Sequence, residues 1–193
     1  MENTSPDRAG IMRWRKDERA RLIEARLAVP AARRAEMAAA IGAGLDALIG
    51  DPAGRLLSFY WPFRGEPDLR GWAASFVARG GRTALPVVVE KAAPLVFREW
   101  KQGEPLEKGV WNIPIPASGP AVVPDIAIAP LVGFDRERYR LGYGGGFFDR
   151  TLASLRTKPM VIGIGYAASE LSTIHPLPHD VAMDAIVTES ERF

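Results

Sequence analysis

The sequence predicts an α/β fold, a sandwich built around a mainly parallel sheet. Apolar segments with the character of strands alternate along the chain with segments rich in helix-forming residues, which is the pattern of parallel strands joined by helices. Several strand segments are apolar throughout, as in DIAIAPLVGF (125–134) and MVIGIGY (160–166), and strands buried on both faces have this composition. A chain of 193 residues without an internal repeat is most simply one domain with a substantial core.

Two helices are expected at the beginning of this domain, which we assign to residues 11–193, after a flexible tail over 1–10. The first helix covers about 12–28 and is rich in helix formers. Pro30 suits the first turn of the second helix, and Gly50 suits its end. The apolar residues of this second helix fall on one face: Met37, Ile41, Leu45 and Leu48.

The rest of the chain alternates strands with helices. The proline-rich segment 112–124 is short and flanked by strands, so it is predicted to be a structured loop and not a linker. Strands are predicted over 55–62, 82–89, 95–100, 125–134, 160–166 and 184–189, and helices over 67–81 and 147–155.

Composition limits the possible functions. The chain has no cysteine, which excludes disulfides, thiolate catalysis and zinc–thiolate sites, and its two histidines are too few for a histidine-based metal cluster. The net charge is +2, with basic residues concentrated between Arg13 and Arg34, so we expect a local phosphate site and no general nucleic-acid-binding surface. The N-terminus is polar and no apolar run has membrane-spanning length, so we expect a cytoplasmic protein without a membrane partner.

The most informative segment is RLGYGGGFFDR (140–150), in which four glycines surround Tyr143 within five positions. Glycine weakens helices and strands alike, so such a concentration needs a reason. A tight turn would require only one or two glycines, and the known P-loop and dinucleotide motifs do not match the spacing. A third interpretation is a cradle for an anion, formed by backbone N–H groups of the loop and of the following helix. The spacing favours this cradle and leaves the turn as the alternative.

Two charged residues flank the glycines. Arg140 could make a bidentate contact with a phosphate, and Asp149 could hold a magnesium ion that bridges the same phosphates. An acidic residue at the start of a helix is also stabilising without any metal, so Asp149 has a purely structural alternative.

The same segment resembles the signature of the 5-formyltetrahydrofolate cyclo-ligase family (5,10-methenyltetrahydrofolate synthetases), R-x-G-R-G-x-G-Y-Y-D. Four other segments resemble further elements of this family in the same order, which makes the match far more specific than one motif. They are the basic opening RKDERARLIEARLAVPAARR, the strand-then-Glu segment SFYWPFRGEPDL, the W-N-I-P element in VWNIPIP and the closing HDVAMDAIVTE. The resemblance implies a three-layer α/β/α sandwich.

The resemblance also implies roles for individual residues. Arg19 would contact ATP together with Arg15 or Lys16, between which the register is ambiguous. Asp149 and Asp184 match the two magnesium positions. The loop that wraps the triphosphate would consist of Arg140, Leu141, Gly142, Tyr143, Gly144, Gly145, Gly146, Phe147 and Phe148. The folate-contacting residues would be Trp61, Glu66, Trp111, Tyr143 and Phe147.

Several of these residues have a structural alternative. The basic residues near the N-terminus could be a solvated helix face. Trp61 and Trp111 could pack in the core, Glu66 could be a solvated loop charge, and Asp184 could be a turn residue.

Three positions depart from the family pattern. Tyr143 stands where the family has its second loop arginine, and Phe147 and Phe148 stand where it has two tyrosines. Loss of the guanidinium removes a charged bidentate donor, whereas loss of the two hydroxyls keeps the stacking faces. The sequence does not identify the cation that would replace the arginine.

The implied reaction is the ATP- and Mg²⁺-dependent conversion of 5-formyltetrahydrofolate to 5,10-methenyltetrahydrofolate. The formyl oxygen is phosphorylated by ATP, the neighbouring nitrogen attacks the activated carbon, and phosphate leaves. We expect a monomer in which Arg140 and Asp149 act in catalysis. Two alternatives stay open: a non-catalytic folate- or nucleotide-binding paralogue, which Tyr143 favours, and a related ATP-dependent enzyme acting on another formyl or amide substrate.

Overall fold

The computed structural model describes residues 7–193. Helix α1 (Arg8–Ala28) begins earlier than predicted. Asp7 explains the difference, because its side chain accepts a hydrogen bond from the Gly10 N–H at 2.7 Å and caps the helix. The tail predicted over 1–10 is therefore wrong for residues 8–10, and residues 1–6 lie outside the described part of the chain.

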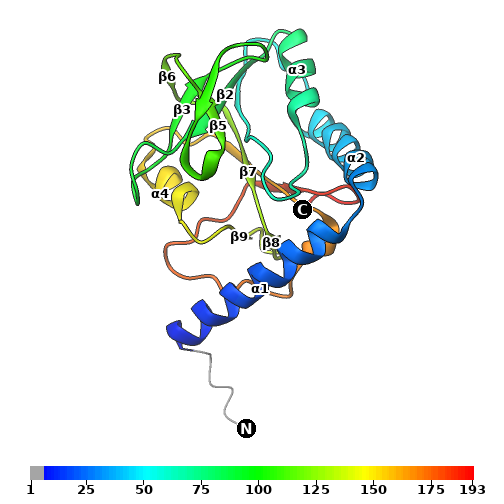
Figure 1. Cartoon of the computed structure of the whole chain (residues 1–193), viewed down its shortest axis with the longest axis vertical. Helices are drawn as coiled ribbons and strands as arrows, with labels where there is room; N and C mark the ends of the chain where they lie inside the picture. The colour runs from blue at the N-terminus through cyan, green and yellow to red at the C-terminus, as the bar shows by residue number, and fades with distance from the viewer. Residues whose placement is uncertain (1–6) are drawn as a thin grey trace.

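A seven-stranded sheet forms the centre of the molecule (Figure 1). Its strands are β1 (Leu56–Ser58), β2 (Arg82–Val87), β3 (Val96–Glu99), β6 (Ala121–Val122), β7 (Ile126–Pro130), β10 (Met160–Ile164) and β11 (Ala185–Val187). They lie in the order β11-β10-β7-β1-β2-β3-β6. Every pair from β11 to β2 is parallel, whereas β3 and β6 extend one edge in antiparallel pairing. The predicted mainly parallel sheet is confirmed.

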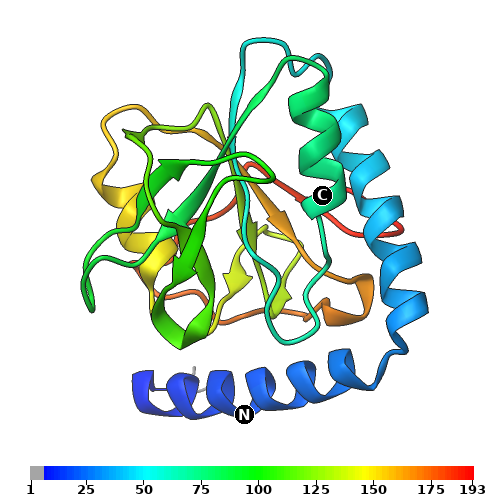
Figure 2. The same ribbon diagram turned by 45° about the horizontal axis from the view of Figure 1, so that its top comes forward.

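Helices cover both faces of this sheet, as the predicted three-layer sandwich requires (Figure 2). Helices α2 (Ala31–Ile49) and α3 (Arg70–Ala78) lie on one face, and α4 (Phe147–Ser154) lies on the other. Alternate residues of a strand supply the two cores: Ile162 of β10 belongs to the core beneath α2, whereas Val161 belongs to the core that contains Leu152 of α4. Burial on both faces explains why the strand segments are apolar throughout.

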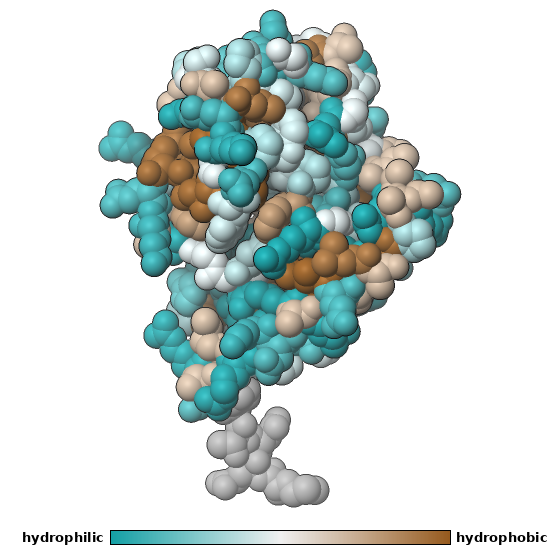
Figure 3. Space-filling view, in the orientation of Figure 1, coloured by the Kyte–Doolittle hydropathy of each residue, from teal (hydrophilic) through white to brown (hydrophobic). Residues whose placement is uncertain are grey.

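Helix α1 lies outside these layers and crosses one end of the sheet (Figures 1 and 2). Its Leu22 packs with Val132, Leu141 and Ile174. The surface over α1 is largely hydrophilic, whereas hydrophobic side chains are exposed around the strands above it (Figure 3). None of the described helices is both long and apolar enough to cross a membrane.

Short elements connect the strands near this end. They are β4 (Leu106–Lys108), the 3-10 helix η1 (Val110–Asn112), β5 (Pro114–Pro116), β8 (Gly133–Phe134), β9 (Arg140–Leu141) and the 3-10 helix η2 (Ala167–Ser169). Strands β4 and β5 form a hairpin with η1 at its turn, and β8 and β9 form a second hairpin directly before the glycine-rich segment. The proline-rich segment 112–124 is therefore structured, as predicted.

The order of the strands creates a crevice at the carboxyl ends of β1 and β7. From β1 the chain continues through β2, β3 and β6 on one side of the sheet, and it then returns to β7 on the other side. The connections leave β1 and β7 in opposite directions. In open α/β sheets, ligands bind at the carboxyl ends of the strands at such a switch point.

Ile128 in β7 provides a test of the core beneath α2, where its side chain is 0 % exposed. Ile128→Ala is expected to lower the free energy of unfolding by about 3 kcal/mol, because it removes buried methyl groups and leaves a cavity. Urea denaturation measures the change. Val123→Ala serves as the control, since Val123 is 56 % exposed, and its effect should stay within about 0.5 kcal/mol. Equal losses in the two variants would contradict the central place of β7.

Candidate functional site

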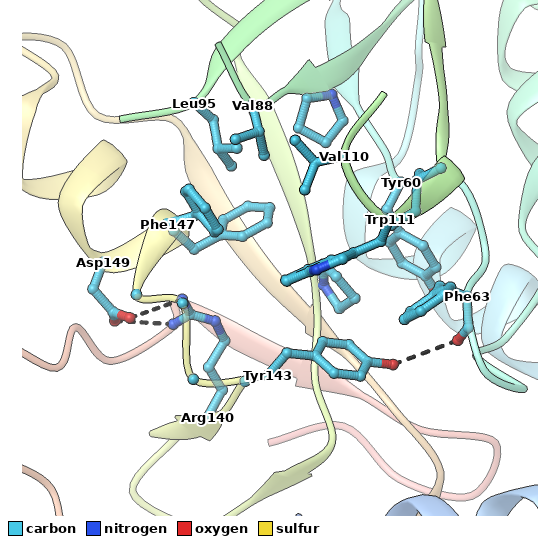
Figure 4. A pocket seen from close by; sticks show the side chains of 18 of the residues that line it. Tyr60, Phe63, Val88, Leu95, Val110, Trp111, Arg140, Tyr143, Phe147 and Asp149 are labelled. Atoms are coloured by element: carbon cyan, nitrogen blue, oxygen red, sulfur yellow. Dashed lines mark hydrogen bonds and ion pairs between the residues drawn. The ribbon is translucent and has the colours of Figure 1, made fainter. Parts of the chain in front are cut away.

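An open pocket lies at the carboxyl ends of β1, β2 and β7. Its lining comes from segments far apart in the sequence: α1, the segment after β1, the end of β2, η1 and the glycine-rich loop. One end carries the charged side chains of Arg140 and Asp149, and the other carries the aromatic rings of Phe63, Trp111 and Tyr143 (Figure 4). Apart from Lys16 and Asp184, every predicted site residue lines this pocket.

The glycine-rich loop (residues 142–146) separates these two ends. Gly144 and Gly146 have φ values of 93° and 63°, which favour glycine. Gly144 passes over Arg19, because a Cβ there would lie 3.4 Å from the guanidinium carbon. Gly142, by contrast, lines the pocket and has no atom within 4 Å of the place where its Cβ would stand. The missing side chain of Gly142 leaves space in the pocket and avoids no clash within the protein, which supports the anion cradle over the plain turn.

The loop leads directly into α4, whose first residues also line the pocket. Gly146 occupies the N-cap position and offers no side-chain acceptor to the first N–H groups of the helix. The free N–H groups and the positive end of the helix dipole are together suited to bind an anion.

Arg140 and Asp149, predicted to act on a phosphate and on a metal, contact each other. Nη1 and Nη2 of Arg140 donate to Oδ1 and Oδ2 of Asp149 at 3.0 and 3.1 Å, and the side chains are 5 % and 15 % exposed. The Val181 N–H also donates to Asp149, at 3.2 Å. The Arg140 Nε is buried and has no acceptor among the described residues. The Nε–H therefore keeps hydrogen-bonding capacity for a further acceptor. A ligand that supplied this acceptor would remove the free-energy cost of the unpaired buried donor.

Helix α1 brings two arginines to the same end of the pocket. Arg15 donates to Asp180 and to two backbone carbonyls, and Arg19 donates to the Gly142 carbonyl at 2.6 Å. Burial and the charge of Arg15 lower the pKa of Arg19, so an anion beside these guanidiniums would be stabilised. Lys16 is exposed and does not line the pocket. The structure therefore places Arg15, and not Lys16, at the site.

Asp149 lines the pocket and Asp184 does not, so the pocket does not contain the predicted pair of metal carboxylates. Asp184 is exposed, lies outside the pocket lining and accepts a hydrogen bond from the Val161 N–H at 2.7 Å. Its role is to pair with the backbone of β10 at the start of the strand. Asp180 lines the pocket in its place. Within residues 7–193, no three His, Asp or Glu side chains gather into a ready-made metal cluster.

The aromatic end offers flat surfaces to a planar ligand. Trp111 is 56 % exposed and stacks on Phe63, with 11° between the ring planes and 6.3 Å between the centroids. Its backbone φ of 56° is unfavourable for a non-glycine residue, and its exposure rules out core packing. Trp61 also lines the pocket, but it packs edge-on against Trp100 with centroids 5.9 Å apart.

The remaining predicted loop residues have different surroundings. Phe147 turns toward Val88 and Leu95 and forms an apolar wall of the pocket (Figure 4). The ring of Phe148 lies beneath the guanidinium of Arg140, 5.3 Å from its carbon, an arrangement that favours the cation. Leu141 is 1 % exposed and supports the loop from the core.

Glu66 places a buried carboxyl group beside the aromatic rings. It is 6 % exposed, and its Oε2 accepts a hydrogen bond from the Phe63 N–H at 2.8 Å. Its Oε1 is buried without a donor among the described residues. Burial raises the pKa of Glu66 to about 7, although the Arg26 charge, the Phe63 N–H and the Tyr143 hydroxyl act in the opposite direction. The free oxygen fits an N–H or amino group of a ligand.

Asp180 and Phe63 line the pocket, and Arg26 donates to the hydroxyl of Tyr143. None of these three residues was predicted from the sequence. Arg26 was detectable, because Arg15, Arg19 and Arg26 are spaced so that they share one helix face. The sequence spacing does not separate Asp180 from Asp184, and Phe63 carries no signal of its own.

Comparison with known proteins agrees with this geometry. A family model described as the 5-formyltetrahydrofolate cyclo-ligase family matches residues 11–189. The chain belongs to this family.

Individual relatives are similar along most of the chain. A Mycolicibacterium smegmatis protein named 5-formyltetrahydrofolate cyclo-ligase is 32% identical over 178 residues, which cover 88% of this chain and 91% of the relative. An Escherichia coli protein of the same name is 32% identical over 147 residues, or 70% of this chain and 78% of the relative.

Two solved structures share the fold. The 5,10-methenyltetrahydrofolate synthetase of Aquifex aeolicus has a TM-score of 0.79 at 24% identity, with 92% of this chain and 91% of that chain covered. The synthetase of Mycoplasma pneumoniae has a TM-score of 0.74 at 21% identity, with 91% and 99% covered.

The buried carboxyl of Glu66 leads to a prediction about stability and pH. Its pKa is raised from 4.5 to about 7, so the folded state favours the protonated form. That contribution to stability is complete below the pKa of the unfolded chain and is lost as the pH rises through 7. Glu66→Gln, which resembles the protonated form, should match wild type near pH 4 and exceed its free energy of unfolding by roughly 3 kcal/mol near pH 9.

Urea denaturation across this pH range measures the difference between the two proteins. A difference that does not change with pH would show that the carboxyl group titrates normally in the folded state.

Proposed function

We propose that the protein converts 5-formyltetrahydrofolate to 5,10-methenyltetrahydrofolate with ATP and Mg²⁺. Membership of the cyclo-ligase family supports this reaction. The observation that carries it is one continuous pocket, which joins an anion cradle to a buried carboxyl group among aromatic rings. A reaction that transfers a phosphoryl group from a nucleotide to a folate requires both kinds of surface within reach of each other.

In the proposed reaction, the formyl oxygen attacks the γ-phosphorus of ATP, and the bond to the departing ADP breaks. The neighbouring nitrogen then attacks the formyl carbon. Inorganic phosphate leaves with the formyl oxygen, and the nitrogen loses its proton. No protein nucleophile takes part, so the protein contributes alignment and stabilisation of charge.

The charged end of the pocket would hold the phosphates. The N–H groups of the glycine-rich loop and of the first turn of α4 would donate to phosphate oxygens, and Arg15 and Arg19 would balance their charge. These donors are held in place before the ligand arrives, because Arg19 is bound to the Gly142 carbonyl and Arg15 to Asp180.

Asp149 and Asp180 fit a magnesium ion in this arrangement. Mg²⁺ is usually held by one or two carboxylates together with substrate phosphates and waters, so a larger acidic cluster is not needed. Both carboxylates line the pocket, and the Val181 N–H, which follows Asp180 in the chain, donates to Asp149. The bound ion would neutralise charge on the phosphates during transfer, and Arg140 and Arg15 would orient the two carboxylates.

The aromatic end would hold the pterin. Trp111 and Phe63 present stacking faces, and the free Oε1 of Glu66 would accept a hydrogen bond from an N–H of the ring. Both ends belong to one pocket whose lining includes the glycine-rich loop, so the formyl group would lie beside the γ-phosphate.

The direct test is the appearance of the 5,10-methenyltetrahydrofolate absorbance from 5-formyltetrahydrofolate and Mg-ATP.

Gly142→Val is expected to raise the Kd for ATP about tenfold or more, roughly 1.4 kcal/mol, with an unchanged melting temperature, because its side chain would occupy free space in the pocket. Gly71→Val is the control, since Gly71 also has no atom near its Cβ position but lies in α3. Wild-type binding of both ligands without turnover would instead identify a non-catalytic paralogue.

A second prediction separates Asp180 from Asp184. Asp180→Asn and Asp149→Asn should each raise the Mg²⁺ concentration for half-maximal activity and lower kcat about a hundredfold, as expected for the loss of charge stabilisation during transfer. Asp184→Asn keeps an acceptor for the Val161 N–H and should behave as wild type. A magnesium titration of the initial rate measures all three. An Asp184 variant as defective as the Asp180 variant would restore Asp184 to the site.

A further inference from the structure

A buried arginine of α1 lies directly behind the aromatic end of the pocket. Arg26 is 8 % exposed, and its Nη2 donates to the Tyr143 hydroxyl at 2.5 Å. Its Nε donates to the Arg64 carbonyl at 2.9 Å and its Nη1 to the Leu131 carbonyl at 3.3 Å. Arg26 thus joins α1 to the glycine-rich loop, to the loop after β1 and to the end of β7.

None of these three acceptors carries a formal charge. A buried guanidinium without a charged partner is costly, so a nearby negative charge is favoured. Glu66 is the nearby group that can supply such a charge, because Arg26 binds the turn that carries it and the Arg26 charge lowers the pKa of Glu66 against the effect of burial. The Arg64 carbonyl that binds Arg26 belongs to the same short turn as Glu66, whose N–H donates to the Phe63 carbonyl at 3.2 Å.

We propose that Arg26 is a positioning residue for the folate end of the pocket: its guanidinium fixes the Tyr143 hydroxyl and supplies the positive charge that faces Glu66. This inference rests on the proposed function in taking the ligand to be a folate. Arg26 also accounts for the departure at position 143. Where the family pattern has a loop arginine, this chain combines a loop tyrosine with a guanidinium delivered from α1.

The other groups that face Glu66 are neutral near pH 7. Tyr143 comes from the glycine-rich loop, Tyr60 from the segment after β1 and Tyr166 from the end of β10. Burial raises the pKa of Tyr60 and of Tyr143, and it raises the pKa of Tyr166 to about 12. Arg26 is therefore the cation in this group, and its removal should raise the pKa of Glu66 above its present value of about 7.

The test follows the titration of the Glu66 carboxyl carbon by NMR in the ligand-free protein, with the signal assigned by its loss in Glu66→Gln. Arg26→Gln removes the charge and should raise the titration midpoint by about one pH unit or more. Arg26→Lys keeps the charge and serves as the matched control, with a midpoint close to that of wild type. An unchanged midpoint in Arg26→Gln would overturn the proposal.

A second readout uses the reaction. In Arg26→Gln, KM for 5-formyltetrahydrofolate should rise severalfold at neutral pH and recover toward higher pH, where the Glu66 carboxyl ionises again, while KM for ATP stays near wild type. A KM for ATP that rises as much as KM for the folate would indicate general damage to the fold and contradict a role at the folate end.

Tyr143→Phe keeps the proposal testable if Arg26→Gln does not fold, because it removes only the hydroxyl. It should raise the Glu66 midpoint by less than Arg26→Gln does and raise KM for the folate. If the Glu66 midpoint and KM for the folate both stay at wild-type values, the Arg26–Tyr143 contact does not position the folate end of the pocket. Absence of turnover in wild type would count against the proposed function alone, since the NMR titration requires no substrate.

Discussion

The pocket depends on three arginines of one helix, of which Arg15 and Arg26 are buried and Arg19 is half-buried. Arg15, Arg19 and Arg26 share the inner face of α1, and a buried guanidinium must find acceptors for its donors. Most of these acceptors are backbone carbonyls of the loops at the carboxyl end of the sheet, together with Asp180 and the Tyr143 hydroxyl. Satisfying the arginines therefore fixes the loops. The same contacts that hold α1 across the end of the sheet give the pocket its walls.

This arrangement also divides the pocket by charge. Arg15, Arg19 and Arg140 bind Asp180, the Gly142 carbonyl and Asp149 at the end suited to phosphates, whereas Glu66 binds the Phe63 N–H at the aromatic end. Tyr143 lies at the aromatic end, with its ring 5.8 Å from that of Phe63. An arginine at this position would bring a second guanidinium against the buried Arg26, and like charges in a buried site disfavour each other. The loop tyrosine and the helix arginine are thus best understood as one combined feature.

The fold was predictable in outline because local patterns determine it. Apolar segments such as 126–130 and 160–164 can be buried on both faces only in a covered parallel sheet, and the helix ends near Pro30 and Gly50 follow from local backbone preferences. The start of α1 was missed, although the Asp7 cap is also a local signal. These features need only neighbouring residues.

The site was predictable as a set of residue types but not as a set of contacts. The glycine-rich loop, its flanking charges and the family pattern around them are visible in the order of the amino acids alone. Only the tertiary structure puts Asp180 and Arg15 in the pocket lining and leaves Asp184 and Lys16 out of it, and it pairs Arg140 with Asp149 and Arg26 with Tyr143. These arrangements join residues from α1 to those near the carboxyl terminus. They depend on how the elements pack against one another, because the free energy of a buried charge is decided by the groups that surround it in space and not by its neighbours along the chain.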